Sequence, residues 1–215
     1  MSLPRGHHSP AAARGRVVGR SLSGERATRI VEAMRESVAE VGIAASTFER
    51  VAAKAGVSRG LLHYYFGTKE RLVIEVLRRD SRLWLEMLDA PLERAQTVDE
   101  VIDVLVSGAA DLARDQPSFY AVLFELFVAG RRNPEIRREL ADLYDVARTH
   151  VAAALRRKHE EGVLALRFDA ETVVSYMFAA TDGTVIQALS DPDGDFTGIR
   201  ASGIAVARFL LDTSA

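Results

Sequence analysis

Cysteine is absent from the 215 residues of this sequence. Without thiolates, a disulfide scaffold, a thiolate zinc site and a cysteine nucleophile are all excluded. The sequence also lacks any run of eighteen apolar residues, which a transmembrane helix requires. Its N-terminus lacks the charged and then apolar layout of a secretory signal. We therefore expect a cytoplasmic protein without a membrane partner.

Enzyme signatures are missing as well. The sequence has no glycine-rich phosphate loop after a strand, no nucleophile elbow and no zinc-ligand spacing. His7 and His8 lie too near the N-terminus, and have no companion ligands, to form a metal site. We expect neither catalysis nor a metal or other cofactor.

Charge is unevenly distributed, although the net charge is only −2. Residues 1–80 carry 14 Lys and Arg against 8 Asp and Glu, whereas residues 81–215 carry 14 against 22. A basic front and an acidic back are expected if only the front of the chain meets a polyanion.

Apolar residues recur at helical spacing almost throughout, and no convincing period of two appears, so the fold is predicted to be all-α. Residues 1–24, rich in Pro, Gly, Ser and Arg, are interpreted as a flexible basic arm. Residues 25–70 are predicted to form a small three-helix domain, and residues 71–215 a larger helical domain. Capping signals place further helix starts near residues 46, 58, 68, 97, 117, 133, 169 and 196.

The local signals make sharper predictions in the front half. The first helix is expected over residues 25–41, with Val41 on its buried face, Arg35 in water and Gly42 at its end. In "STFE", Ser46 is expected to cap the second helix. The helix that follows Thr68 is expected to end at or just before Pro91.

Residues 48–67 have the spacing of a helix-turn-helix, whose second helix lies in the major groove of DNA. Gly56 lies in the turn, between apolar residues that close the two helices together. Turning the second helix by about 100° per residue separates two faces. Leu61, Leu62, Tyr65 and Phe66 fall on one side; Gly60, His63 and Tyr64 fall on the other, with Arg59 at its edge.

The outward set suits DNA chemically. Arginine can bond guanine N7 and O6, tyrosine can contact a thymine methyl, and glycine allows close approach of the backbone. Ser58 and Lys69 begin consecutive helices, where a hydroxyl, an ammonium and free N–H groups can hold phosphates.

The stretch "TFERVAAKAGVSRGLLHYYFGTKERLV", residues 47–73, resembles the DNA-binding domain of the TetR (tetracycline-repressor-like) family of bacterial transcriptional regulators. The match is densest in "AGVSRGLLHYYFGTKE" and covers roughly residues 25–75. The resemblance implies a repressor that binds a palindromic operator in double-stranded DNA as a homodimer. It further implies release from the operator by a small-molecule effector bound in the C-terminal domain.

Carried over by position, the resemblance implies phosphate contacts for Thr47 and Lys69. It places Ser58, Arg59, Gly60, His63 and Tyr64 in or beside the major groove, and directs the Tyr65 hydroxyl to the DNA backbone. A minor-groove contact by the arm stays open, as does the alternative of a helical interaction module without specific DNA binding. Titration with fragments of the protein's own promoter region discriminates these two functions.

Aromatic residues gather in the back half, where they fill core or line a mostly apolar effector pocket. Asp111, Asp182, His150 and Gln187 are candidates for its few polar groups, although a salt bridge or an interface hydrogen bond explains them equally well. The ligand-binding residues predicted are Trp84, Phe119, Phe124, Phe127, Tyr144, His150, Tyr176 and Asp182.

The last two helices are apolar nearly all round, in "AETVVSYMFAATDGTVIQAL" and "IRASGIAVARFLL". A helix that is apolar on every side must be covered on every side. Pairing with the same two helices of a second subunit would cover them, and it matches the dimer interface implied by the resemblance.

Overall fold

The computed structural model describes residues 24–115 and 117–212, without the side chains of residues 109–111, 113, 117 and 118. Within these ranges the chain forms α-helices and no strands, which confirms the all-α prediction. The helices are α1 (Glu25–Ala45), α2 (Phe48–Ala55), α3 (Arg59–Phe66), α4 (Lys69–Arg94), α5 (Val98–Asp115), α6 (Pro117–Gly130), α7 (Pro134–Glu160), α8 (Ala170–Ser190) and α9 (Thr197–Leu211). The predicted basic arm, apart from Gly24, lies outside the described residues.

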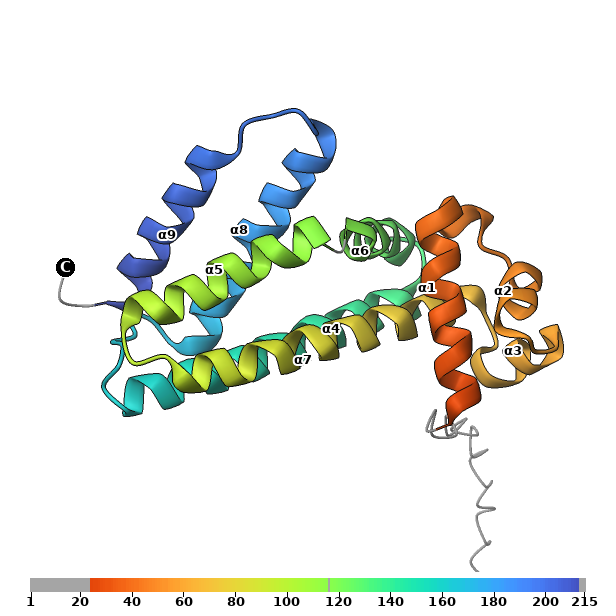
Figure 1. The fold of residues 1–215 in the computed structure, drawn as a ribbon, viewed down its shortest axis with the longest axis horizontal. Helices are drawn as coiled ribbons and strands as arrows, with labels where there is room; N and C mark the ends of the chain where they lie inside the picture. The colour runs from red at the N-terminus through yellow and green to blue at the C-terminus, as the bar shows by residue number, and fades with distance from the viewer. Residues whose placement is uncertain (1–23, 116, 213–215) are drawn as a thin grey trace, which may run out of the picture.

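Helices α1, α2 and α3 form one end of the molecule, and α8 and α9 form the other (Figure 1). Helices α4 and α7 connect these ends and lie side by side. They run in the same direction, because Arg71 pairs with Glu135 near their starts and Lys158 bonds to the Glu93 carbonyl near their ends. This long pair joins the two parts of the molecule mechanically.

The core consists of two clusters, and α4 contributes to both. Its first half places Leu72 and Leu77 against the small helices, α6 and the start of α7. Its second half places Leu88 and Leu92 against α5, α7, α8 and α9. The predicted domain boundary at residue 70 therefore falls at the start of a helix that belongs to both cores.

Several helix starts have the predicted caps. Thr97 accepts a hydrogen bond from the Glu100 backbone at 3.2 Å, and the Glu100 carboxylate accepts one from Thr97 N at 3.2 Å, forming a complete capping box. Asn133 accepts from the first backbone N–H groups of α7, and Asp169 does the same for α8. These polar side chains satisfy N–H groups that the helix itself leaves unpaired.

Three expectations for the front half were wrong. Thr47, not Ser46, caps α2; Ser46 is buried, accepts from the Ser37 hydroxyl at 2.9 Å and donates to the Gly42 carbonyl. Val41 is exposed, because Gly42 interrupts the helix with a φ of 76° before its last turn. Arg35 is not left in water, because it forms an ion pair with Asp80 of α4.

The predicted end of α4 was also wrong. The helix continues through Pro91 to Arg94, although proline supplies no N–H for the helical ladder. Leu88 and Leu92 on either side of it are almost fully buried in the second core cluster. Tertiary packing therefore maintains the helix past its weakest residue.

Candidate DNA-binding surface and ligand cavity

The turn between α2 and α3 depends on one glycine. Gly56 has φ 65° and ψ 38°, a left-handed conformation that costs other residues about 1–2 kcal/mol. Its N–H bonds back to the carbonyls of Ala52 and Ala53, and Val57 N bonds to Ala52 O at 3.0 Å. These bonds end α2 and redirect the chain into α3 within two residues.

The inner face of α3 is anchored by Leu62 and Phe66, both buried in the first core cluster with Phe48 of α2. Leu61 is only half-buried, and Tyr65 is 36% exposed at the edge of the inner face. The anchored residues fix the rotation of α3 about its own axis, so they decide which side chains project outward.

The outer face carries the predicted base-reading residues. Arg59, Gly60, His63 and Tyr64 are all exposed, and the Tyr64 side chain is 61% exposed. A Cβ added at Gly60 would meet only the Ser58 hydroxyl, at 4.0 Å, so a closely approaching surface would meet backbone there. Arg59 makes no ion pair with any described residue, which leaves its guanidinium available to a ligand outside the chain.

His63 differs from the other outward residues because it also supports the fold. Its Nδ1 lies 3.3 Å from the Gly67 carbonyl, and its ring packs edge-on against Phe48 at 4.7 Å between centroids. These contacts fix the ring plane and leave Nε2 as the atom available for an outside contact.

The predicted phosphate-binding residues occupy three helix starts. Thr47 caps α2 by accepting from Arg50 N, and Ser58 begins α3 without a capping bond from its side chain. Lys69 begins α4, but its ammonium donates to the carbonyls of Ile43 at 2.9 Å and Ala44 at 3.4 Å. Lys69 therefore also ties α4 to the end of α1.

Two other basic residues of this end, Arg50 and Lys54, form ion pairs with carboxylates of α1. Lys54 lies 2.6 Å from Glu40 and 3.0 Å from Glu36, and Arg50 lies 2.8 Å from Glu40. The hydrogen bond from Lys54, followed by that from Arg50, holds the pKa of Glu40 below its usual value. Their charge is thus partly neutralised within the domain, in contrast to that of Arg59.

A cavity of about 90 Å³ lies among α4, α5, α6, α7 and α8, counted as the space open to the centre of a water-sized sphere. One water molecule needs about 10–15 Å³ on this measure, so the cavity admits a compact organic molecule. Its lining is mostly apolar and aromatic: Ser81, Trp84, Leu105, Leu112, Phe119, Tyr120, Leu123, Leu143, Tyr144, Ala147, Val151, Val174, Met177, Phe178, Thr181 and Asp182.

The polar groups of the cavity centre on Asp182. The Tyr144 hydroxyl donates to Asp182 Oδ2 at 2.5 Å. Burial raises the pKa of Asp182, a shift that the Tyr144 hydrogen bond opposes, and burial also raises the pKa values of Tyr120 and Tyr144. Among the described residues, the buried Trp84 Nε1 has no hydrogen-bond acceptor, although an indole N–H normally finds one.

Four of the eight residues predicted for ligand binding line this cavity: Trp84, Phe119, Tyr144 and Asp182. Phe124, Phe127, His150 and Tyr176 do not. Phe127 lies behind Tyr144, with ring centroids 6.1 Å apart, and Tyr176 is half exposed on the other face of α8. His150 lies 2.7 Å from Asp89 at the surface.

Tyr120 and Phe178 belong to the lining but were not among the predicted ligand residues. Tyr120 follows Phe119 directly, and Phe178 precedes Asp182 by one helical turn, which is the signal that could have selected it. Gln187 bonds to the Gly183 carbonyl of its own helix instead, and the Asp111 side chain lies outside the described residues.

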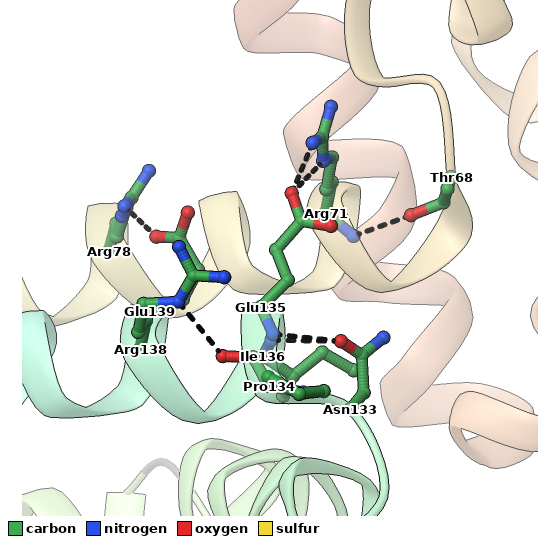
Figure 2. Close-up of polar contacts among 9 residues, drawn as sticks. All are labelled: Thr68, Arg71, Arg78, Asn133, Pro134, Glu135, Ile136, Arg138 and Glu139. Atoms are coloured by element: carbon green, nitrogen blue, oxygen red, sulfur yellow. Dashed lines mark hydrogen bonds and ion pairs between the residues drawn. The ribbon is translucent and has the colours of Figure 1, made fainter.

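Ion pairs join the front of α4 to α7 (Figure 2). Arg71 Nε lies 2.9 Å from Glu135 Oε1. Arg78, two turns further along α4, pairs with Glu139, one turn further along α7. Phe119 of α6 borders both the ligand cavity and a small pocket beside the Arg35–Asp80 pair. The cavity is thus one side chain away from a contact between α1 and α4.

Large apolar side chains remain exposed on α8 and α9: Tyr176, Ile186, Leu189, Ile199 and Phe209. Three hydroxyls on these helices are bonded within their own helix: Thr184 donates to the Ala180 carbonyl, Ser190 to the Ile186 carbonyl and Ser202 to the Gly198 carbonyl. We call these five side chains the α8/α9 apolar face.

No described helix is long and apolar enough to cross a membrane. In the part of the chain that the structure covers, no three His, Cys, Asp or Glu side chains are grouped as metal ligands.

Comparison with known proteins gives matches along most of the chain. Residues 30–76 match the family model for bacterial regulatory proteins of the tetR family, and residues 93–212 match that for the tetracyclin repressor-like C-terminal domain. The regulator UidR of Escherichia coli K12 is 26% identical over 135 residues, covering 63% of this chain and 67% of UidR. The repressor AcnR of Corynebacterium efficiens is 25% identical, covering 86% of this chain and 89% of AcnR.

Solved structures share the fold. A transcriptional regulator from Saccharomonospora viridis, solved in complex with choline, superimposes with a TM-score of 0.68 at 24% identity. The match covers 86% of this chain and 96% of that one.

Proposed function

Because the chain belongs to the TetR family of bacterial transcriptional regulators, we propose that it is a non-catalytic, homodimeric repressor that a small molecule releases from a palindromic operator. The main support for the proposal is the orientation of α3. Leu62 and Phe66 bury its inner face in the core, and its outer face presents exposed groups for DNA. The likeness to AcnR, a repressor, supports the direction of regulation.

In this proposal the two α3 helices of a dimer enter successive major grooves, about 34–36 Å apart. Arg59 reads a guanine edge, Gly60 lets the backbone approach, and His63 and Tyr64 contact neighbouring bases. Thr47, Ser58 and Tyr65 hold phosphates, as does Lys69 from the start of α4. These contacts fix the register of the protein on the duplex, whereas the base contacts give sequence preference.

Dimerisation supplies the spacing between the two reading helices. The α8/α9 apolar face exposes five large side chains, and a two-fold axis through it would bury the side chains of one copy against those of the other. The bonded hydroxyls of Thr184 and Ser202 can enter such an interface without losing their hydrogen bonds.

The effector is proposed to act on α4. The cavity borders α4 at Ser81 and Trp84, and the same helix starts at Lys69, which holds the end of α1. A ligand that binds more tightly when α4 is displaced would change the separation of the two α3 helices. Such coupling is typically about 1–3 kcal/mol. The choline complex of the Saccharomonospora viridis regulator supports a ligand site in this fold.

Two substitutions test the DNA assignments. Arg59→Ala should relax the preference at one base position in each half-site and cost about 1–3 kcal/mol. Lys69→Ala should weaken binding to all sequences and lower the salt slope by roughly one unit.

The matched control is Lys54→Ala, since Lys54 is already paired with Glu36 and Glu40. Binding to operator variants is measured by fluorescence anisotropy at several salt concentrations. If Arg59→Ala and Lys69→Ala have the same effect on sequence preference and salt slope, the division into base-reading and phosphate-binding residues is wrong.

A further inference from the structure

The ligand cavity contains a carboxylate that lacks a counter-charge. Asp182 accepts a hydrogen bond from Tyr144, but no lysine, arginine or histidine forms an ion pair with it among the described residues. A carboxylate withdrawn from water without a cationic partner is costly, so such groups usually serve a ligand or shift toward the neutral form.

Aromatic rings line the same cavity as this carboxylate. Phe178 precedes Asp182 by one turn of α8, so both side chains lie on the same face of the helix. The Phe178 ring centroid lies 6.2 Å from that of Tyr144 and 6.4 Å from that of Trp84. Aromatic faces attract cations, and groups of such rings recognise ammonium ligands.

We propose that the cavity binds a compact organic cation, an amine or a quaternary ammonium, with Asp182 as its counter-charge and Trp84, Tyr144 and Phe178 as its aromatic walls. This inference rests on the proposed function, because it names the chemical class of the effector. An anionic ligand would face Asp182 without a basic residue to neutralise it, since no described lysine, arginine or histidine borders the cavity. A neutral apolar ligand would cover the carboxylate and leave it without a counter-charge.

The unpaired indole N–H of Trp84 predicts a second chemical feature of the ligand. The buried Trp84 Nε1–H has no acceptor in the part of the chain that the structure describes, and Trp84 borders the cavity. A hydroxyl or carbonyl oxygen on the cation would accept that hydrogen bond. The cavity therefore favours an organic cation that also carries one oxygen acceptor.

Trp84 is the only tryptophan of the chain, so its fluorescence reports on the cavity directly. The probes are tetramethylammonium, tert-butanol and pivalate, which share a compact branched shape but are cationic, neutral and anionic. The full-length protein is titrated with each at constant ionic strength, with sodium chloride as the salt control. A saturable fluorescence change is expected for tetramethylammonium, at a concentration at least tenfold below any change with the other two.

Asp182→Asn keeps the shape of the side chain and removes its charge, and should weaken tetramethylammonium binding at least tenfold. Asp142→Asn is the matched control, because Asp142 is exposed on α7 outside the cavity. Phe178→Leu provides a second variant, which should bind tetramethylammonium more weakly than wild type. Circular dichroism checks that this variant is folded. The proposal is overturned if tert-butanol or pivalate binds as tightly as the cation, if no probe gives a saturable change, or if Asp182→Asn binds the cation like wild type.

Operator binding by the wild-type protein separates this inference from the function on which it rests. If the protein binds its operator and shows no preference for the cation, the inference alone fails. If it binds the cation and no operator, the proposed function fails and the ligand class stands.

Discussion

Replacing either of two glycines in the helix-turn-helix by alanine is expected to change the stability of the fold, in opposite directions. Gly60 is the second residue of α3 with ordinary helical geometry, and the added Cβ would meet only Ser58 Oγ, at 4.0 Å. Alanine is favoured over glycine in a helix by up to about 1 kcal/mol. Gly60→Ala should therefore stabilise the fold and raise the melting temperature by about 2–4 °C at most for a chain of this size.

Operator binding should fall in the same variant. If the α3 backbone approaches DNA at Gly60, the methyl group occupies space that the bases need, and losing one base contact costs about 1–3 kcal/mol. This corresponds to a dissociation constant that is higher by roughly 5- to 150-fold.

Gly56→Ala supplies the matched contrast. No atom lies within 4 Å of its added Cβ, but its φ of 65° costs alanine about 1–2 kcal/mol. Any loss of affinity there should accompany a loss of stability. Thermal melts and anisotropy on the same preparations measure both quantities. A stabilised Gly60→Ala protein that binds the operator like wild type would refute the close approach of α3 to DNA.

Two further substitutions test the other parts of the molecule. Ile186 is 50% exposed, so full burial in a dimer is worth about half of 1.5–3 kcal/mol in each copy. Ile186→Glu should therefore weaken dimerisation by roughly 10- to 150-fold or more, measured by analytical sedimentation. The control Val146→Glu on α7 should leave the dimer intact. If Ile186→Glu dimerises like wild type, the α8/α9 apolar face is not the dimer interface. Burial raises the pKa of Asp182, so its ionised form destabilises the empty protein as pH rises through that pKa. Asp182→Asn should melt higher than wild type at pH 8, with a difference that shrinks as pH falls toward 4; a less stable variant at pH 8 would show that the carboxylate is already compensated.

Much of the front half could be predicted because its signals are local. Gly56 and Gly67 both have positive φ. Helical periodicity along α3 correctly separated the buried Leu62 and Phe66 from the exposed Arg59 and Gly60. Reciprocal caps such as Thr97 with Glu100 depend only on residues three apart. Such features follow from the sequence without knowledge of what packs nearby.

Features decided by tertiary packing were harder to predict. Ser46 and Thr47 are adjacent hydroxyl residues, and burial against Ser37 decides that Thr47 is left to cap α2. Lys69 was predicted to contact phosphate, and its bonds to the carbonyls at the end of α1 could not be foreseen from local signals.

The cavity lining shows the same limit. Helices α6 and α8 are apolar on most sides, so periodicity does not reveal which aromatics face inward. Phe119 lines the cavity and Phe127 lies behind Tyr144, although both are phenylalanines of one helix. Only the position of α7 and α8 against α6 distinguishes them.

Footprinting on the DNA upstream of the protein's own gene tests whether α3 reads a palindromic operator. We expect protection of one palindromic site, with two half-sites centred about one helical turn apart on the duplex. The Arg59→Ala variant should lose discrimination at one symmetric pair of positions within that site. Uniform protection of all DNA, or protection of no site at low salt, would contradict the assignment of α3 as a sequence-reading helix.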